Sequence, residues 1–313
     1  MLLTGELIMN RKSIRGSLLL LLGAVIWGAA FAAQRAGMDH VPPFTFSGIR
    51  MLLAWAVMVP ASMVMKKKTG GAAETRQQKI EQRKGGLICG SLLFVATSLQ
   101  QIGLVYTSAG KSGFLTALYV VLVPVAGWLL LKKRPGKVIW AGVGLAVVAL
   151  YLLCVPAAGY QVEKGDLLLV GCAVCFTGQI LFVDYFAPRV DGFRLARDEF
   201  LITGALSMVI ALLTETIRLD GILEAAFPIV YAGIFSGAIG YTLQIIGQRD
   251  VNPTIASLIM CLESVFAVLT GAVLLGERMT GREAAGCVLM FTAVILAQLS
   301  TVLKGKHPTK KGS

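Results

Sequence analysis

Apolar residues recur along the chain in runs of about 20, each long enough to cross a hydrocarbon core of about 30 Å as a helix. Charged residues, prolines and glycines separate the runs. The pattern predicts an all-α membrane protein with ten transmembrane helices. The predicted spans are residues 16–36, 44–65, 85–105, 111–131, 137–155, 165–186, 197–215, 225–246, 254–275 and 281–303.

Composition agrees with a lipid environment rather than with a soluble fold. Of the 313 residues, 56% are hydrophobic and 15% are charged, whereas an average soluble domain has about 25% charged residues. The bilayer is therefore the expected solvent and the expected lipid partner of this chain.

The basic charge follows a topological pattern. The formal net charge is +12, which by itself could suggest binding to the phosphate backbone of a nucleic acid. With the N-terminus in the cytoplasm, however, most lysines and arginines fall on the cytoplasmic side. These stretches are Arg11–Arg15, Lys66–Lys84, Lys132–Lys137, Arg189–Arg197, Arg249 and Lys304–Lys311. We therefore predict a multi-pass inner-membrane protein with both termini cytoplasmic and no nucleic-acid partner.

The first span also has features of a cleavable signal peptide. Basic residues at 11–15 precede an apolar run and a group of small residues at 28–33. The same segment recurs later in the chain, however, so we interpret it as the first helix of the folded unit.

An internal repeat gives the domain organisation. A shift of 144 positions lays residues 99–103 on 243–247, which share the pattern Leu-Gln-x-Ile-Gly, and continues to match over three helices. A shift of 149 lays Gly16 on Gly165 and Trp27 on Phe176. The predicted units are residues 16–155 and 165–303, with 1–15 and 304–313 as cytoplasmic tails. The longer loop at 66–84 accounts for the difference between the two shifts.

A unit with five helices enters the membrane from opposite sides in its two copies. The sequence therefore predicts two inverted five-helix repeats, an arrangement that gives transporters two similar conformations open to opposite faces around a midplane site. Channels can also contain inverted repeats, so the repeat alone leaves that alternative open.

The two halves resemble the EamA-type units of the drug/metabolite transporter superfamily. The similar segments are Leu262-Glu263-Ser264-Val265-Phe266-Ala267, Leu274-Leu275-Gly276-Glu277-Arg278-Met279-Thr280, Arg50-Met51-Leu52-Leu53-Ala54 and Gly113-Phe114-Leu115-Thr116 running to Pro124. The resemblance implies ten helices, cytoplasmic termini, a central cavity between the halves, and export or exchange of small metabolites. It does not name the solute.

One part of the family pattern is present in only one half. The second half reads Gly276-Glu277-Arg278, but the first reads Lys132-Lys133-Arg134. Glu277 lies at a helix terminus three residues before Thr280, so we expect a structural role in capping the next helix rather than contact with the solute.

An ionisable residue well inside a span is a functional candidate, because a charge there costs about 2.5–3.5 kcal/mol or more on insertion scales. Glu263 lies near the middle of the ninth span and can take up a proton or bind a cationic group. Arg50 lies within the second span, where its guanidinium can hold a carboxylate or phosphate. The alternatives are a structural hydrogen bond for Glu263 and snorkelling to the interface for Arg50.

Four further residues complete the predicted solute-binding and proton-binding set. Gln100 and Gln244 are repeat-related amides, and each can meet a solute or another helix. Trp27 and Tyr119 can form flat walls of a cavity, although aromatic packing explains them equally simply.

Other classes of protein lack support in the sequence. The two histidines, His40 and His307, lie outside the predicted spans, and no metal-ligand cluster, nucleophile elbow or ATP-binding loop is present. We expect no enzyme activity, no cofactor and no metal. The sequence favours a secondary transporter that moves a small metabolite, amino-acid-like solute or drug by alternating access, with export as the expected direction. A channel or facilitator, and a structural or sensory role, stay open as alternatives, as does the choice between monomer and homodimer.

Overall fold

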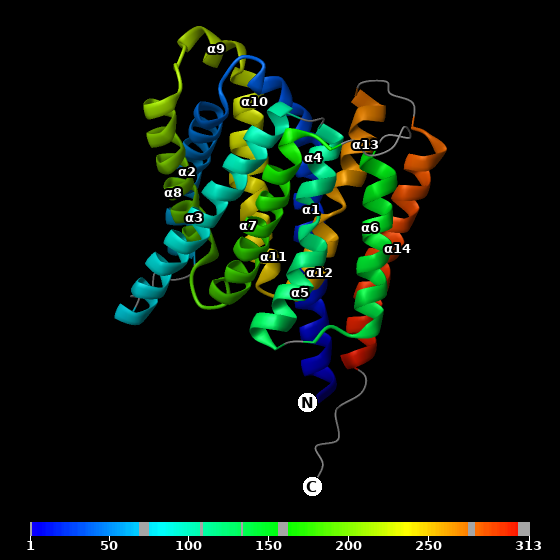
Figure 1. Cartoon of the computed structure of the whole chain (residues 1–313). Coiled ribbons are helices and arrows are strands. Elements are labelled where there is room, and N and C mark those ends of the chain that lie inside the picture. The colour runs from blue at the N-terminus through cyan, green and yellow to red at the C-terminus, as the bar shows by residue number, and fades with distance from the viewer. Residues whose placement is uncertain are drawn as a thin grey trace.

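Helices account for the architecture, and most run roughly along one common axis (Figure 1). The computed structural model describes residues 2–68, 75–106, 109–132, 134–155, 162–274 and 279–305. Within these ranges no β-strand occurs. The predicted all-α fold class is therefore confirmed for the described residues.

The helices follow the apolar runs of the sequence. In chain order they are α1 (Leu2–Met38), α2 (Pro43–Lys68), α3 (Arg76–Tyr106), α4 (Ala109–Thr116), α5 (Tyr119–Leu131), α6 (Lys137–Cys154), α7 (Lys164–Phe186), α8 (Gly192–Thr214), α9 (Leu219–Glu224), α10 (Ala226–Val230), the π-helix η1 (Tyr231–Tyr241), α11 (Thr242–Gln248), α12 (Pro253–Met260), α13 (Glu263–Leu274) and α14 (Gly281–Gly305).

Nine segments of the described residues are long and apolar enough to cross a membrane, and they overlap nine of the ten predicted spans. The remaining prediction, 197–215, falls on α8, which has 23 residues. This helix is not among the nine segments. Its N-terminal half carries Arg194, Arg197, Asp198 and Glu199, and charged residues reduce the apolar character of a helix. The chain is thus a multi-pass membrane protein by its apolar helices.

Three predicted spans are not single regular α-helices. The span predicted at 111–131 consists of α4 and α5, and the span predicted at 254–275 consists of α12 and α13. The span predicted at 225–246 contains α10, the π-helix η1 and α11. Apolar periodicity predicted the crossings but not these interruptions, since a short break leaves the hydrophobic run intact.

The α4–α5 and α12–α13 breaks have the same hydrogen-bonding pattern. In both, backbone N–H groups bond to carbonyls three residues earlier, which tightens the chain into a 3₁₀-like turn. In the α4–α5 break, Leu118 N donates to Leu115 O at 3.3 Å and Val120 N donates to Ala117 O at 3.0 Å. In the α12–α13 break, the corresponding bonds are Leu262 N to Ile259 O at 3.1 Å and Ser264 N to Cys261 O at 3.2 Å. Each pair is related by the 144-residue shift of the sequence repeat.

Helices α6 and α14 pack against each other through small residues. A Cβ atom placed on Gly142 would lie 3.2 Å from the Ala293 carbonyl oxygen, and one on Gly286 would lie 3.1 Å from the Ala149 carbonyl oxygen. Gly142 and Ala149 become Gly286 and Ala293 when 144 is added. The same contact therefore occurs twice across one interface, and small residues let the helix backbones approach closely.

A second pair of glycine contacts joins the first helix of each half to the third helix of the other. A Cβ atom on Gly16 would lie 2.7 Å from the Gly247 carbonyl oxygen, and one on Gly165 would lie 2.6 Å from the Gly103 carbonyl oxygen. Thus α1 crosses α11 and α7 crosses α3 in the same way. A side chain at any of these four positions would hold the helices apart.

The buried core is continuous through the bundle and includes residues of both halves, such as Leu20, Leu93, Leu150 and Ile245. Large apolar side chains also cover outer faces, including Leu130 on α5 at 75% exposure. An extensive exposed apolar surface is unusual for a soluble monomer, but it fits contact with lipid.

Candidate functional site

One cavity inside the helix bundle has a volume of about 50 Å³. All six residues predicted to contact a solute or a proton line it, although their roles in binding stay predictions. The lining residues are Trp27, Ala30, Phe31, Gln34, Arg50, Gln100, Thr116, Tyr119, Phe176, Ile180, Ser236, Tyr241, Gln244, Met260 and Glu263. Both halves of the chain thus contribute polar and aromatic groups to a single space.

Glu263 and Tyr119 meet at the two helix breaks. Tyr119 begins α5 and Glu263 begins α13. The Tyr119 hydroxyl donates a hydrogen bond to Glu263 Oε1 at 3.4 Å, and the Cys261 thiol donates to the Ala117 carbonyl oxygen at 3.7 Å. In both contacts the partners are 144 residues apart. Each break therefore touches its own equivalent in the other half.

The start of α12 determines how deep Glu263 lies. Pro253 occupies the first turn, where its missing N–H costs no helical hydrogen bond. The Asn252 side chain caps the helix by accepting from the Thr254 N–H at 3.0 Å. The eight residues of α12 span about 12 Å. Glu263 comes three residues after the end of α12 and is buried within the bundle.

Arg50 is a buried cation with unused donors. It lies on α2, its side chain is 2% exposed, and its guanidinium carbon is 5.8 Å from the centre of the Phe46 ring. Its Nε and Nη2 atoms have no hydrogen-bond partner among the described residues. Guanidinium groups only donate hydrogen bonds and match carboxylate or phosphate geometry. The arrangement can therefore accept an anionic group of a solute in the cavity.

Gln100 and Gln244 both line the cavity but form different hydrogen bonds. Gln100 Nε2 donates to the Thr116 hydroxyl at 3.4 Å. Gln244 Nε2 donates to Gln179 Oε1 and to Gln248 Oε1, both at 3.0 Å. Their equivalence in sequence therefore does not extend to equivalent partners.

Trp27 is held by the π-helix. Its indole N–H donates to the Ser236 carbonyl oxygen at 3.1 Å, and its ring centre is 5.1 Å from that of Tyr241. A Cβ atom on Gly240 would lie 2.6 Å from the indole nitrogen, so only glycine leaves room for this ring. Trp27 and Tyr241 thus form an aromatic wall that joins α1 to η1, and π-helical segments occur frequently at functional sites.

Glu199 is a buried carboxyl group that the sequence analysis missed. Its side chain on α8 is fully buried, and its Oε1 accepts a hydrogen bond from Gln179 Nε2 at 2.9 Å. Its Oε2 has no partner among the described residues. Gln179 in turn accepts from Gln244, so a polar chain connects Glu199 to the cavity. Glu199 lies at the charged beginning of the predicted span 197–215 and was not singled out, although an acid directly before an apolar run was the available signal.

Arg50 and Glu199 occupy equivalent positions of the two halves. Helix α2 begins at Pro43 and α8 begins at Gly192, which differ by the same 149 residues that relate Gly16 to Gly165. Adding 149 to Arg50 gives Glu199. One half therefore places a buried cation where the other half places a buried carboxyl group.

The structural candidate Glu277 lies outside the described residues. Within the described part of the chain, no group of three or more His, Cys, Asp or Glu side chains is placed to hold a metal ion.

The sequence shows similarity to transporters over almost its whole length. Residues 14–155 and 163–299 each match the EamA-like transporter family. An "Uncharacterized transporter" of Archaeoglobus fulgidus is 29% identical over 92% of this chain and 87% of the relative. The "Probable amino-acid metabolite efflux pump" of Salmonella typhimurium is 22% identical over 92% of this chain and 95% of the relative. A crystal structure of a protein with 20% identity has a TM-score of 0.77, covering 92% of this chain and 98% of the other, and supports the fold alone.

Proposed function

Because this chain belongs to the EamA-like transporter family, we propose that it moves a small, amino-acid-like solute across the cytoplasmic membrane by alternating access. One observation carries the proposal. A single buried cavity brings together Arg50 and Tyr119 from the first half with Gln244 and Glu263 from the second. A solute held between them contacts both halves, so relative movement of the halves can change which side has access to it.

Ten membrane-spanning helices are part of this proposal, with α8 as the tenth. The beginning of α1 and the end of α14 lie at the same end of the bundle in Figure 1. A chain whose two ends lie on one side crosses the membrane an even number of times. Helix α8 packs along α2 and α3 and has 23 residues, which suffice for a crossing.

The recurring contacts support two inverted repeats. In a structure with twofold symmetry, residue i contacts j while the equivalent of j contacts the equivalent of i, and residues beside the axis contact their own equivalents. The paired contacts of Gly142 and Gly286 follow the first rule. The contact between Tyr119 and Glu263 follows the second. An axis relating units of five helices lies in the membrane plane, which makes the copies inverted.

The π-helix accounts for an apparent mismatch in this symmetry. A Cβ atom on Gly90 would lie 3.0 Å from the Glu199 carbonyl oxygen, and one on Gly233 would lie 2.9 Å from the Arg50 carbonyl oxygen. These glycines are 143 residues apart, whereas Gln100 and Gln244 further along are 144 apart. One additional residue in η1 explains the change, because a π-turn accommodates more residues than an α-turn.

The chemistry of the cavity favours a solute with both an acidic and a basic group. Arg50 supplies donors for a carboxylate, and Glu263 supplies an acceptor for an ammonium group. Trp27 and Tyr241 offer aromatic faces for the rest of the solute. The Salmonella relative named as an amino-acid metabolite efflux pump supports this class of solute and the direction of export.

Glu263 is the proposed proton-coupling group. A carboxyl group that binds an ammonium group when ionised attracts it less when protonated. When the cavity faces outward, uptake of a proton by Glu263 would therefore release the solute to the outside. The empty transporter would then carry the proton back to the cytoplasm as it turns inward. Most lysines and arginines fall on the side of the two termini, which supports a cytoplasmic location for both termini. In export, the solute is therefore taken up from that side.

The test is transport by the purified chain in liposomes, with radiolabelled amino acids compared with cationic dyes and sugar phosphates. Each class is measured with and without a pH gradient, in both directions. Saturable, gradient-dependent movement of an amino acid, with an apparent affinity that Arg50→Gln strongly weakens, would support the proposal. Non-saturable flux would instead indicate a channel, and transport of dyes alone would overturn the amino-acid assignment.

A further inference from the structure

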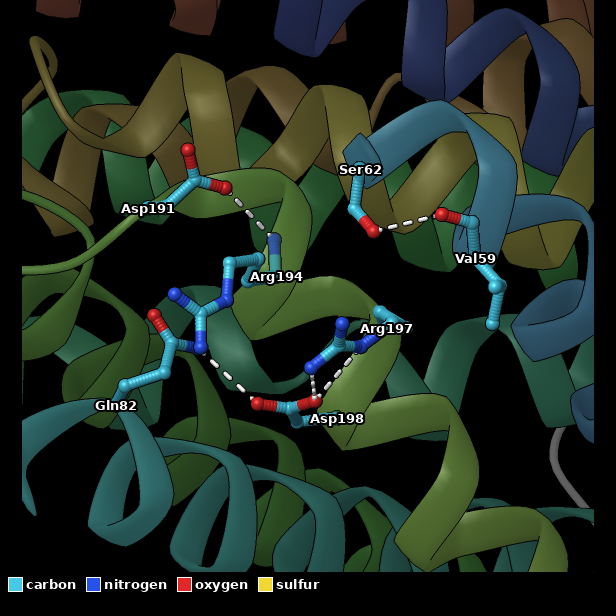
Figure 2. A network of polar contacts seen from close by, with 7 residues as sticks. All are labelled: Val59, Ser62, Gln82, Asp191, Arg194, Arg197 and Asp198. Carbon is cyan, nitrogen blue, oxygen red and sulfur yellow. Dashed lines mark hydrogen bonds and ion pairs between the residues drawn. The ribbon is translucent and has the colours of Figure 1, made fainter. Parts of the chain in front are cut away.

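A second cavity lies at the end of the bundle where α3 and α8 begin, away from the central one. Its volume is about 500 Å³. Its lining residues are Lys79, Gln82, Arg83, Arg194, Arg197, Asp198, Leu201 and Ile202. We call this space the α3–α8 pocket. Figure 2 shows four of its polar residues, which come from the first two turns of α3 and α8: Gln82, Arg194, Arg197 and Asp198.

The two helices show the same succession of side chains by sequence spacing, although Leu87 on α3 lies one turn beyond the lining residues of the pocket. On α8, Arg194, Arg197 and Leu201 follow at intervals of three and four residues and therefore share one face. On α3, Lys79 and Arg83 are four residues apart, and Leu87 follows after another four. Each face thus passes from two basic residues to a leucine in the direction of the bundle interior.

Close contact between the helices fixes this register. A Cβ atom on Gly86 would lie 2.7 Å from Cβ of Asp198, and one on Gly90 would lie 2.9 Å from Cβ of Ile202. The helices therefore touch along these glycines and hold the basic faces at the same depth. Both helices start at this end of the bundle, so the basic turns lie outward and the leucines lie towards the hydrocarbon.

Positive charge predominates in the pocket. Four of its lining residues are basic and Asp198 is the acidic one. Asp198 is already engaged, since its Oδ1 accepts from Arg197 Nε at 2.9 Å and its Oδ2 accepts from Gln82 Nε2 at 3.3 Å (Figure 2). Without counting Arg194, the single carboxylate of Asp198 still faces Lys79, Arg83 and Arg197, so the pocket retains a net attraction for anions.

Ordinary solvation is the simplest role for basic residues at a membrane surface. Two features distinguish this group. The bases converge from two helices on one cavity, and apolar side chains lie directly below them. Leu201 is 39% exposed and Leu87 is 58% exposed, so both are available to an acyl chain. A small hydrated anion would have no use for this apolar continuation.

We propose that the α3–α8 pocket binds one anionic phospholipid, with its phosphate between Arg83 and Arg197 and an acyl chain along Leu201 and Leu87. Arginine side chains donate paired hydrogen bonds to phosphate oxygens. Basic pockets between transmembrane helices at a membrane surface are suited to anionic headgroups. The site is separate from the proposed solute cavity and requires no transport activity.

Native mass spectrometry of the detergent-purified full chain tests the site. The probes are phosphatidylglycerol, zwitterionic phosphatidylethanolamine and inorganic phosphate. The variant Arg83→Gln/Arg197→Gln removes two pocket charges, and Arg134→Gln/Lys137→Gln removes two exposed charges elsewhere as the matched control. We expect the wild type and the control to retain one phosphatidylglycerol in preference to phosphatidylethanolamine. The pocket variant should bind phosphatidylglycerol at least about tenfold more weakly, because it has lost charge-assisted hydrogen bonds.

Three results would overturn the proposal. Equal weakening in both double variants would show attraction by overall charge, and equal retention of phosphatidylethanolamine would remove the anionic preference. Displacement of the lipid by millimolar inorganic phosphate would show a site for free phosphate. If the pocket variant Arg83→Gln/Arg197→Gln does not fold, the single variant Arg83→Gln is compared with the single control Lys137→Gln. A photoreactive acyl chain of phosphatidylglycerol should also crosslink to the segment around Leu87 and Leu201.

Discussion

Several backbone contacts recur in the two halves of the protein, but the halves differ in the chemistry they bring to the cavity. At the helix breaks, the first half places the phenol of Tyr119 where the second places the carboxyl group of Glu263. On the second helix of each half, Arg50 corresponds to Glu199. The glycine contacts between helices, by contrast, recur with nearly the same distances.

Helix packing and solute binding place different requirements on the two halves. Helix packing depends on small residues at crossing points, and an equivalent crossing in each half needs the same small residue. A site for a solute with unlike ends needs unlike groups, which a symmetric pair cannot supply. The comparison therefore predicts paired effects for packing variants and unequal effects for cavity variants.

The largest effect is expected from Arg50→Gln. Loss of the cation removes charge-assisted hydrogen bonds worth about 1.5–3 kcal/mol, which corresponds to roughly 10-fold to 100-fold weaker binding of a carboxylate-bearing solute. The apparent affinity in liposome transport measures the change, and Arg50→Lys should recover part of it. Unchanged affinity in Arg50→Gln would exclude contact between this residue and the solute.

Gly16→Ala and Gly165→Ala should destabilise the protein to a similar extent. Each new Cβ would lie within 2.7 Å of a backbone carbonyl oxygen of the facing helix, and overpacking of this kind costs about 1–3 kcal/mol. Thermal unfolding in detergent provides the measurement. Gly144→Ala is the control, because no atom lies within 4 Å of a Cβ built there. Loss of stability at only one of the paired positions would argue against equivalent packing.

Glu263→Gln should remove the dependence of solute binding on pH. In the wild type, acidification protonates the carboxyl group and weakens binding of an ammonium group, so affinity falls as pH falls. The uncharged amide should give a flat profile with affinity about tenfold lower than that of the ionised wild type. Among the described residues, the other titratable groups that interact with Glu263 are phenols and thiols, namely Tyr119, Tyr241, Cys154, Cys172 and Cys261.

Phenols and thiols ordinarily titrate above neutral pH, so a profile between pH 5 and 7 reports mainly on carboxyl groups. The second buried carboxyl group, Glu199, provides the internal comparison. A pH dependence that persists in Glu263→Gln but disappears in Glu199→Gln would move the proton-coupling role to α8.

Tyr119→Phe should have the smallest effect. The hydroxyl contributes one long hydrogen bond of 3.4 Å to Glu263, and the ring that lines the cavity is retained. A neutral hydrogen bond contributes about 0.5–1.5 kcal/mol, so a change of less than about tenfold in affinity is expected. A larger loss than in Glu263→Gln would reverse the proposed roles of the two equivalent positions.

The sequence alone predicted the membrane crossings, the internal repeat and two of the candidate site residues. Runs of apolar residues predicted the membrane crossings, because their length is set by the bilayer and not by neighbouring helices. The repeat at a shift of 144 identified equivalent positions, and the cost of charge in lipid selected Glu263 and Arg50. The matches of both halves to one transporter family agree with the family resemblance of residues such as 262–267.

Only the tertiary structure showed how these positions combine. Three predicted spans contain a helix break or a π-helix. Tyr119 contacts Glu263, which is 144 residues away in the sequence. Gln179 links Glu199 to Gln244 in the cavity. Hydropathy describes how each segment meets lipid, and it is insensitive to a break of two residues or to which helix lies opposite. Contacts between distant segments depend on the packing of the complete bundle, so the cavity and its asymmetric chemistry exist only in the folded chain.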